Sequence, residues 1–356
     1  MDDGATSFVL VASDLCLVSP AEYDRVAKLL AAETGVTANQ FWWTFSHTHS
    51  APEVGPPGLA ASFLGDRYTH EVDPSYTEMV AKSLIAAVKE ARAKLAPARM
   101  RIGWGHANAN INRRARDVEG ETFLGFNPDG PVDRRIGLIA LDDASGKPIG
   151  LIANYAMHGT VLGQPNLLIS GDAQGIVSAY VEDKIGAPMI YVNGAAGNLA
   201  PIYTTQPTPA AGRLKQFRAL LGDKIIEAYR AMPAAAVEVQ LATGAAVVET
   251  ARKDGMKDSA ELADYVKPAQ IRLPVRFLKL AKDTAIWAAP LELFCEIAID
   301  VRERSPFSNT MYFGYTNGWL GYLLTAAELP LGGYEPRVSP YTARAEEDLK
   351  RTVLGF

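Results

Sequence analysis

The stretch SPAEYDRVAKLLAAETGVTANQFWWTFSHTHSAP, residues 19–52, contains one expected helix, one expected strand and two histidines. Ser19 is a preferred N-cap residue, Pro20 suits the first helical position, and Gly35 is a typical C-terminal stop. The aromatic run FWW that follows is typical of a strand. A helix that leads directly into an apolar strand predicts an α/β protein.

The same alternation continues along the chain. Strands are expected in RMRIGWGHAN, IGLIALDD, IGLIANYAMH and PMIYVNG, and helices in PSYTEMVAKSLIAAVKEARAKL, AGRLKQFRALLGDKIIEAYRAM and LELFCEIAIDVRERS. The pattern predicts an α/β fold of mixed β-sheets flanked by helices. No internal repeat or long linker divides the sequence, so residues 1–356 are expected to form a single domain. The Pro-rich stretches 201–212 and 324–341 are expected to be surface loops that could gate a site.

The composition bounds the class of protein. Hydrophobic residues make up 48% of the chain, charged residues 21%, and the formal net charge is −5. An acidic balance argues against nucleic acid or an anionic membrane surface as a partner, and no apolar run reaches the ~20 residues of a membrane helix. Cys16 and Cys295 are expected to be buried thiols. The start MDDGATSF has no features of a signal peptide, so a cytoplasmic protein is expected as written, or a secreted or periplasmic one if the N-terminus is truncated.

His47 and His49 follow the FWW strand, one residue apart. In extended backbone, residues i and i+2 point to the same side, so the two imidazoles are expected to share one face. Such a pair suits a metal, or one metal ligand beside a proton-transfer group. The alternative is a half-buried strand end with incidental histidines.

Other polar residues also stand where strands end or helices begin. His158 ends a second apolar strand, a position where open α/β sheets build their sites. Asp172 is either a site carboxylate or an N-cap. The loop VNGAAGNLAP, residues 192–201, could approach a ligand with its backbone or be a plain turn. Glu292 follows a strand at the start of an expected helix, and Tyr322 and Tyr334 flank a Pro/Gly-rich loop, where tyrosines often only anchor the chain.

Seven segments of the chain, in order, resemble the catalytic domain of the neutral/alkaline, non-lysosomal ceramidase family. They are SHTHSAP, INRRAR, NYAMHGT, SGDAQG, NGAAGNLAP, PLELF and TNGWLGYLLT with GGYE. The resemblance implies a zinc amidohydrolase with an α/β catalytic domain. Carried over by motif, the zinc ligands are His47, His158, Glu292 and Tyr322. Two imidazole nitrogens, one carboxylate and one phenolate are donors that suit zinc.

The resemblance also implies residues that face the substrate. His49 is the expected proton-transfer group, and Arg113 and Tyr334 are expected to steady an oxyanion or a substrate carboxylate. The remaining residues expected to line the substrate site are Asp172, Asn198 and Ala200.

The chain departs from the family pattern at the nucleophile. The family carries a serine in the motif GDVSPN, and the matching stretch here is GNLAPI, with Ala200 at the serine position and Asn198 at the aspartate position. An alanine cannot be a nucleophile. The family's N-terminal strand and C-terminal immunoglobulin-like domain are not recognised either.

We therefore expect a zinc-dependent hydrolase in which metal-activated water attacks a small-molecule or lipid-like acyl amide or ester. Two alternatives remain. One is a true ceramidase that uses another hydroxyl, such as that of Thr204. The other is an inactive relative that binds lipid or metal.

Overall fold

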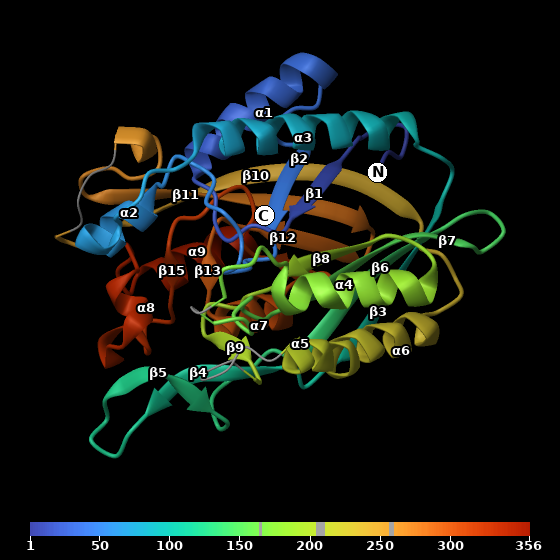
Figure 1. Ribbon diagram of the computed structural model, residues 1–356. Helices are drawn as coiled ribbons and strands as arrows, with labels where there is room; N and C mark the ends of the chain where they lie inside the picture. The colour runs from blue at the N-terminus through green and yellow to red at the C-terminus, as the bar shows by residue number, and fades with distance from the viewer. Residues whose placement is uncertain (164–165, 204–210, 256–259) are drawn as a thin grey trace.

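Two four-stranded sheets form the centre of the computed structural model, which describes residues 1–163, 166–203, 211–255 and 260–356 (Figure 1). In the first sheet β7 and β8 are parallel, and in the second β12 and β14 are parallel, while the other neighbours are antiparallel. The prediction of mixed sheets in an α/β fold is confirmed. The first sheet has the order β3 (Arg99–His106), β6 (Arg135–Asp142), β7 (Pro148–Tyr155), β8 (Met189–Asn193), and the second has the order β10 (Val239–Ala251), β11 (Gln270–Ala281), β12 (Thr284–Ala288), β14 (Asn309–Phe313).

Three smaller sheets carry the polar motifs of the sequence. Two of them are parallel pairs, and the third is an antiparallel group of three strands. They are β1 (Val9–Ser13) with β2 (Phe41–Phe45), β13 (Glu292–Leu293) with β15 (Tyr322–Leu323), and β5 (Thr122–Asn127), β4 (Asn110–Arg116), β9 (Leu199–Pro201).

Helices cover the outer faces of the sheets. α4 and α6 pack on the first sheet, while α9 packs on β10 and α7 on β14. In Figure 1, α1 and α3 lie along the upper edge and α4, α5 and α6 gather at the lower right. The helices are α1 (Pro20–Thr34), α2 (Leu59–Leu64), α3 (Pro74–Ala93), α4 (Asp172–Ile185), α5 (Ala211–Phe217), α6 (Asp223–Ala231), α7 (Cys295–Arg304), α8 (Tyr334–Arg337) and α9 (Ala345–Leu354), with short helical turns η1 (Gly65–Arg67), η2 (Arg218–Gly222), η3 (Ala260–Leu262) and η4 (Leu329–Leu331).

Side-chain alternation along β6 shows how the layers form. Leu138 and Ala140 belong to the core that packs against α4 and α6, whereas Ile139 belongs to the core between the two sheets. Because successive side chains of a strand point to opposite faces, one buried strand supplies both cores. Trp42 and Phe313 also lie in the core between the sheets, so β2 is tied to the centre of the fold.

The first helix has the ends that its sequence predicts. The hydroxyl of Ser19 accepts a hydrogen bond from the amide of Ala21 at 3.3 Å, and Gly35 ends α1 in the left-handed conformation with φ 75°. Only a residue without a Cβ adopts that conformation at no steric cost. The predicted helix between Ser19 and Gly35 is confirmed.

The structure departs from the sequence prediction at three places. Residues 211–231 are helical as predicted, but the π-helical turn η2 changes the hydrogen-bond pattern between α5 and α6. The segment 324–341 is not simply a surface loop, since it contains η4 and α8 and several of its side chains, among them Glu335 and Tyr341, are buried. The strands β4 and β5 were not anticipated; in β4 three arginines interrupt the apolar pattern.

Within the described part of the chain, no helix combines the length and the apolar character that crossing a bilayer requires.

Candidate metal centre

His47 lies two residues beyond the end of β2. Its backbone has φ 60°, a left-handed conformation that is uncommon for a residue with a side chain. The prediction of extended backbone at His47 and His49 was therefore wrong at His47. The Nδ1 atom of His47 lies 2.9 Å from the carbonyl oxygen of Cys16. Since a carbonyl only accepts, Nδ1 carries a proton, and Nε2 is the nitrogen left to bind a metal.

His158 follows β7, and its imidazole is held through Nδ1 by backbone carbonyls, as that of His47 is. Its Nδ1 atom lies 2.7 Å from the carbonyl oxygen of Ala196 and 3.1 Å from that of Leu199, so its Nε2 is left with a lone pair. Gly159 makes the approach of the two histidine segments possible, because a Cβ at this position would lie 2.6 Å from the carbonyl oxygen of His47. Fixing a ligand imidazole through its other nitrogen is typical of metal sites.

Glu292 and Tyr322 are brought together by the parallel pair β13–β15, in which they are direct partners. Glu292 therefore does not begin a helix as predicted, since α7 begins at Cys295. Gly197 allows the neighbouring loop to lie against this pair, because a Cβ there would approach the carbonyl oxygen of Glu292 to 2.5 Å.

The four side chains converge in the interior. Oε2 of Glu292 lies 3.2 Å from Nε2 of His47 and 3.0 Å from Nε2 of His158. The phenolic oxygen of Tyr322 lies 3.4 Å from Nε2 of His158. All four residues are at most 3% exposed. Two imidazole nitrogens and one carboxylate oxygen that converge in this way, with a phenol beside them, are donors of the kind that a metal ion such as zinc accepts.

The charges of this group are strongly coupled. Burial favours the neutral form of Glu292, yet His47 and His158 hold its pKa well below the ordinary value. Burial alone would lower the pKa of His47, but the Glu292 carboxylate and the Cys16 sulfur raise it to about 10. Burial and the nearby Arg113 lower the pKa of His158 to about 3. Without a metal, one proton on His47 therefore compensates the buried carboxylate, and a bound cation would take over that role.

Two further contacts of Glu292 were not predicted. Trp319 donates its indole N–H to Oε1 of Glu292 at 2.9 Å, and the hydroxyl of Tyr315 lies 3.4 Å from Oε2. The Tyr315 ring also stacks on the His47 ring, with centroids 4.3 Å apart. Both residues fall in or next to the motif TNGWLGYLLT, but nothing in their local pattern distinguishes them from core aromatics.

His49 is exposed beside the buried group. Its Nε2 lies 3.3 Å from Nε2 of His47, and it lines a cavity of about 360 Å³ together with Cys16 and Trp319. The other walls are mostly apolar and come from residues 17–19 and 51–64, with Tyr68 and His70. A mainly apolar cavity with a few convergent polar groups is the usual form of a small-molecule site.

Cys295 is buried as expected, whereas Cys16 is only half-buried, so the prediction of a buried thiol was wrong for Cys16. The Sγ atom of Cys16 lies 3.8 Å from Nδ1 of His47. Burial would raise the pKa of Cys16, but His49 and His47 lower it to about 6.

We expect iodoacetamide to alkylate Cys16 of the native protein at pH 7.5 and to leave Cys295 unmodified, because the thiolate is the reactive form and only Cys16 reaches the cavity. Peptide mapping by mass spectrometry checks this result, with urea-unfolded protein as the control in which both thiols react. Native alkylation of Cys295 ahead of Cys16 would contradict the assignment.

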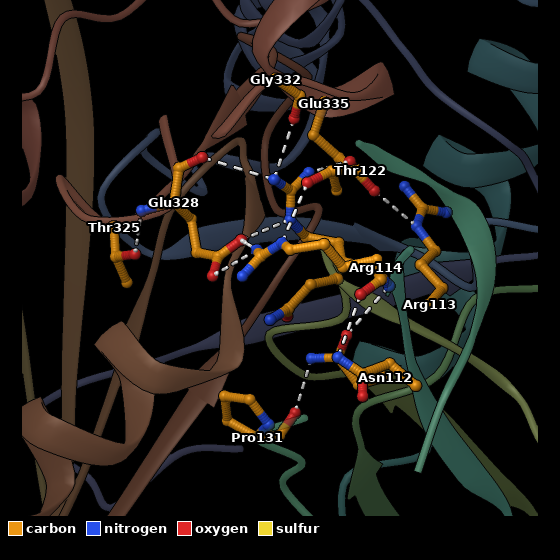
Figure 2. A network of polar contacts seen from close by, with 12 residues as sticks. Asn112, Arg113, Arg114, Thr122, Pro131, Thr325, Glu328, Gly332 and Glu335 are labelled. Carbon is orange, nitrogen blue, oxygen red and sulfur yellow. Dashed lines mark hydrogen bonds and ion pairs between the residues drawn. The ribbon is translucent and has the colours of Figure 1, made fainter. Parts of the chain in front are cut away.

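Arg113 reaches the centre from β4. Its Nη2 donates to the phenolic oxygen of Tyr322 at 2.9 Å, and its Nε donates to Glu335 at 2.9 Å. Figure 2 shows the surrounding network, in which Glu335 lies between Arg113 and Arg114 and Arg114 extends to Glu328. The negative neighbours raise the pKa of Arg113 above its ordinary value although burial opposes this.

Tyr334 lies at the rim of this network. It is 37% exposed, and its ring centroid lies 5.9 Å from that of Tyr322. The Arg113 guanidinium lies 5.9 Å from the centre of the Tyr334 ring. The three predicted residues Arg113, Tyr322 and Tyr334 are thus neighbours, with Tyr334 on the solvent side.

The structure places Asp172 and Asn198 in contacts with the protein itself. The Asp172 carboxylate accepts from the amides of Val161 at 3.1 Å and Leu162 at 2.8 Å, which fixes the loop after His158. The Asn198 amide donates to Glu296 at 2.7 Å, and its oxygen accepts from the Cys295 amide at 3.0 Å. These contacts give both side chains partners within the protein, and their contact with substrate stays a prediction.

Ala200 lies in β9 and is 6% exposed, paired with Ile111 of β4. Thr204, the alternative hydroxyl, lies outside the described residues.

An α/β fold with a buried His–His–Glu group beside a cavity is an arrangement found in metal-dependent hydrolases. The family model for neutral/alkaline non-lysosomal ceramidase, N-terminal, matches residues 1–200, more than half of the 356 residues. The chain belongs to this family of hydrolases.

Curated relatives match the chain in sequence. A neutral ceramidase of Pseudomonas aeruginosa is 28% identical over 207 residues, which are 56% of this chain and 30% of the relative. A neutral ceramidase of Mycobacterium tuberculosis is 28% identical over 210 residues, 58% of this chain and 32% of the relative. The aligned stretch thus spans about a third of the length of these relatives.

A solved structure matches the fold over nearly the whole chain. The crystal structure of neutral ceramidase from Pseudomonas aeruginosa superposes with a TM-score of 0.79 at 19% identity, covering 99% of this chain and 66% of that one. At this identity the likeness shows a common fold.

Proposed function

We propose that this protein is a zinc-dependent hydrolase that cleaves an acyl amide or ester bond with metal-activated water. The observation that carries the proposal is the convergence of His47 Nε2, His158 Nε2 and Glu292 Oε2, with Tyr322 adjacent, beside a mainly apolar cavity. Family membership supports hydrolysis, and the names of the relatives support a lipid-like amide as substrate.

The residues of the site would have three roles: to hold the metal, to transfer a proton and to stabilise the developing charge. His47, His158, Glu292 and Tyr322 would hold the ion. When bound, zinc supplies a Lewis acid that lowers the pKa of water from ~15.7 towards ~7. His49 is exposed, lines the cavity and lies next to His47, so it can accept a proton from the attacking water and return it to the leaving group. Arg113 and Tyr334 would stabilise the charge that develops on the carbonyl oxygen.

The absence of a hydroxyl at residue 200 favours water over a covalent nucleophile. The alternative of a true ceramidase would need another hydroxyl, and Thr204 was the predicted candidate. The alternative of an inactive relative that binds lipid but no metal is disfavoured by the buried ligand group, because burying a carboxylate and two imidazoles has a free-energy cost that a plain apolar core avoids. The described residues pack around shared cores, which supports the proposal of a single domain for residues 1–356.

We expect the purified, zinc-loaded protein to hydrolyse at least one member of a panel of acyl amides and esters with different chain lengths. A chelator is expected to abolish this activity and added zinc to restore it, because the metal would provide the electrophile. Release of the carboxylic acid, measured by mass spectrometry, checks the result. A protein that binds zinc but cleaves nothing in the panel would favour the inactive relative, and activity that persists in chelator would exclude the metal mechanism.

A further inference from the structure

Arg113 is fixed by two partners that are distant in sequence. Its Nη2 donates to Tyr322, 209 residues away, and its Nε donates to Oε1 of Glu335, 222 residues away. The side chain of Arg113 is 10% exposed and that of Glu335 is 1% exposed. The planar guanidinium is thus held in one orientation by a carboxylate on one side and a phenol on the other.

Glu335 is itself held on both oxygens. Its Oε2 accepts from Nη1 of Arg114 at 2.6 Å, while Oε1 accepts from Arg113. Arg114 also donates to Glu328 at 2.7 Å and to the carbonyl oxygen of Gly332 at 2.9 Å, as Figure 2 shows. A carboxylate whose two oxygens are both engaged in the interior is suited to hold its neighbours in place.

We propose that Glu335 is a positioning residue that fixes Arg113 against the phenol of Tyr322 and thereby sets where Tyr322 stands relative to His158 and Glu292. Tyr322 belongs to a strand of two residues, β15, whose backbone pairs with β13 and accepts a hydrogen bond from the Ser339 hydroxyl at 2.7 Å. These contacts fix the backbone, and the Arg113–Glu335 pair adds a constraint on the phenolic end of the side chain. This inference rests on the proposed function, because the proposed function gives Arg113 and Tyr322 their roles at the metal centre.

Loss of Glu335 must be separated from loss of stability. Removing one carboxylate leaves two buried guanidinium groups with one fewer partner, which destabilises a fold. The double variant Arg114→Met with Glu335→Leu removes one charge of each sign and keeps the side-chain volume of the interior. The stability of the fold should therefore recover. Arg113 still lacks the partner of its Nε in this variant. The matched control is Asp142→Leu, because Asp142 is also buried and is paired with Arg101 at 2.6 Å on another sheet.

We expect Glu335→Leu and the double variant to lower kcat by about 10²-fold with KM little changed, since misplacement of a catalytic group by ~1 Å has an effect of that size. In the Co²⁺-substituted protein, the visible absorption bands of both variants should differ from those of the parent, because the phenol near the ion has moved. Asp142→Leu should lose thermal stability but keep the parent's kcat and spectrum.

Two results would overturn the proposal. One is a kcat and a spectrum of the double variant that match those of Asp142→Leu. The other is a loss of kcat that is recovered in the double variant together with stability. The spectrum does not depend on turnover, so a parent without hydrolytic activity would count against the proposed function, while the spectral comparison would still decide whether Glu335 positions Tyr322.

Discussion

Replacing His158 with alanine is expected to remove most of the bound zinc and with it essentially all hydrolysis. The parent should carry about one zinc per chain, the stoichiometry of a four-ligand site. His158 is fully buried and its imidazole is held by two backbone carbonyls, so its Nε2 is fixed within the buried group. A site with three ligands holds zinc far more weakly. Elemental analysis of the purified variant measures the loss, and His47→Ala should behave in the same way.

A matched control is His106→Ala. His106 is an exposed histidine on β3 and takes no part in the His47–His158–Glu292 group. This variant should keep the zinc and the activity of the parent. A parent that stays folded but takes up no zinc on reconstitution would disprove the site, and a His158→Ala variant that keeps its zinc would disprove this ligand.

Replacing His49 with alanine is expected to lower kcat by ~10²–10⁴-fold, the usual contribution of a positioned proton-transfer group. Zinc content should stay unchanged, because His49 is the exposed neighbour of the ligand His47 and not part of the buried group. Steady-state kinetics together with elemental analysis separate the two effects. Equal loss of zinc and of activity would instead make His49 a ligand.

Ala200→Ser tests whether water or a side-chain hydroxyl is the nucleophile. If water attacks, a serine at this position adds nothing to the reaction, and kcat should stay within about tenfold of the parent, ~1.4 kcal/mol of barrier. No burst of acyl-enzyme should appear, because no covalent intermediate forms. The opposing view predicts a parent without activity and a gain of ceramide cleavage in Ala200→Ser with Asn198→Asp. Observing that gain would refute the water mechanism.

Local signals in the sequence predicted the elements that depend on local physics. The caps of α1 were read correctly because Ser19 and Gly35 act within a few residues of their own positions. The sheets were predicted because long apolar runs must be buried wherever they lie in the fold. The candidate ligands were identified through motif resemblance, and the structure brings His47, His158, Glu292 and Tyr322 together.

Other features depend on contacts between distant segments. β13 and β15 have two residues each, too few for any periodicity to predict them, and they form only because they pair with each other. The left-handed backbone at His47 is sustained by surrounding contacts, among them the hydrogen bond from its amide to Leu15. The burial of Glu335 in the segment 324–341 is compensated by arginines more than 200 residues earlier.

The amino-acid sequence by itself determined the α/β class, the positions of the long helices and strands, and the set of residue types available for a metal site. These follow from backbone propensity and from apolar periodicity, which act over a few residues. Only the tertiary structure decided which nitrogen of His47 and of His158 faces the metal centre and which residues contact Glu292 and Arg113. It also decided that the Asn198 side chain contacts the start of α7. These choices depend on the pairing of segments far apart in the chain, and such pairing is set by the packing of the whole fold.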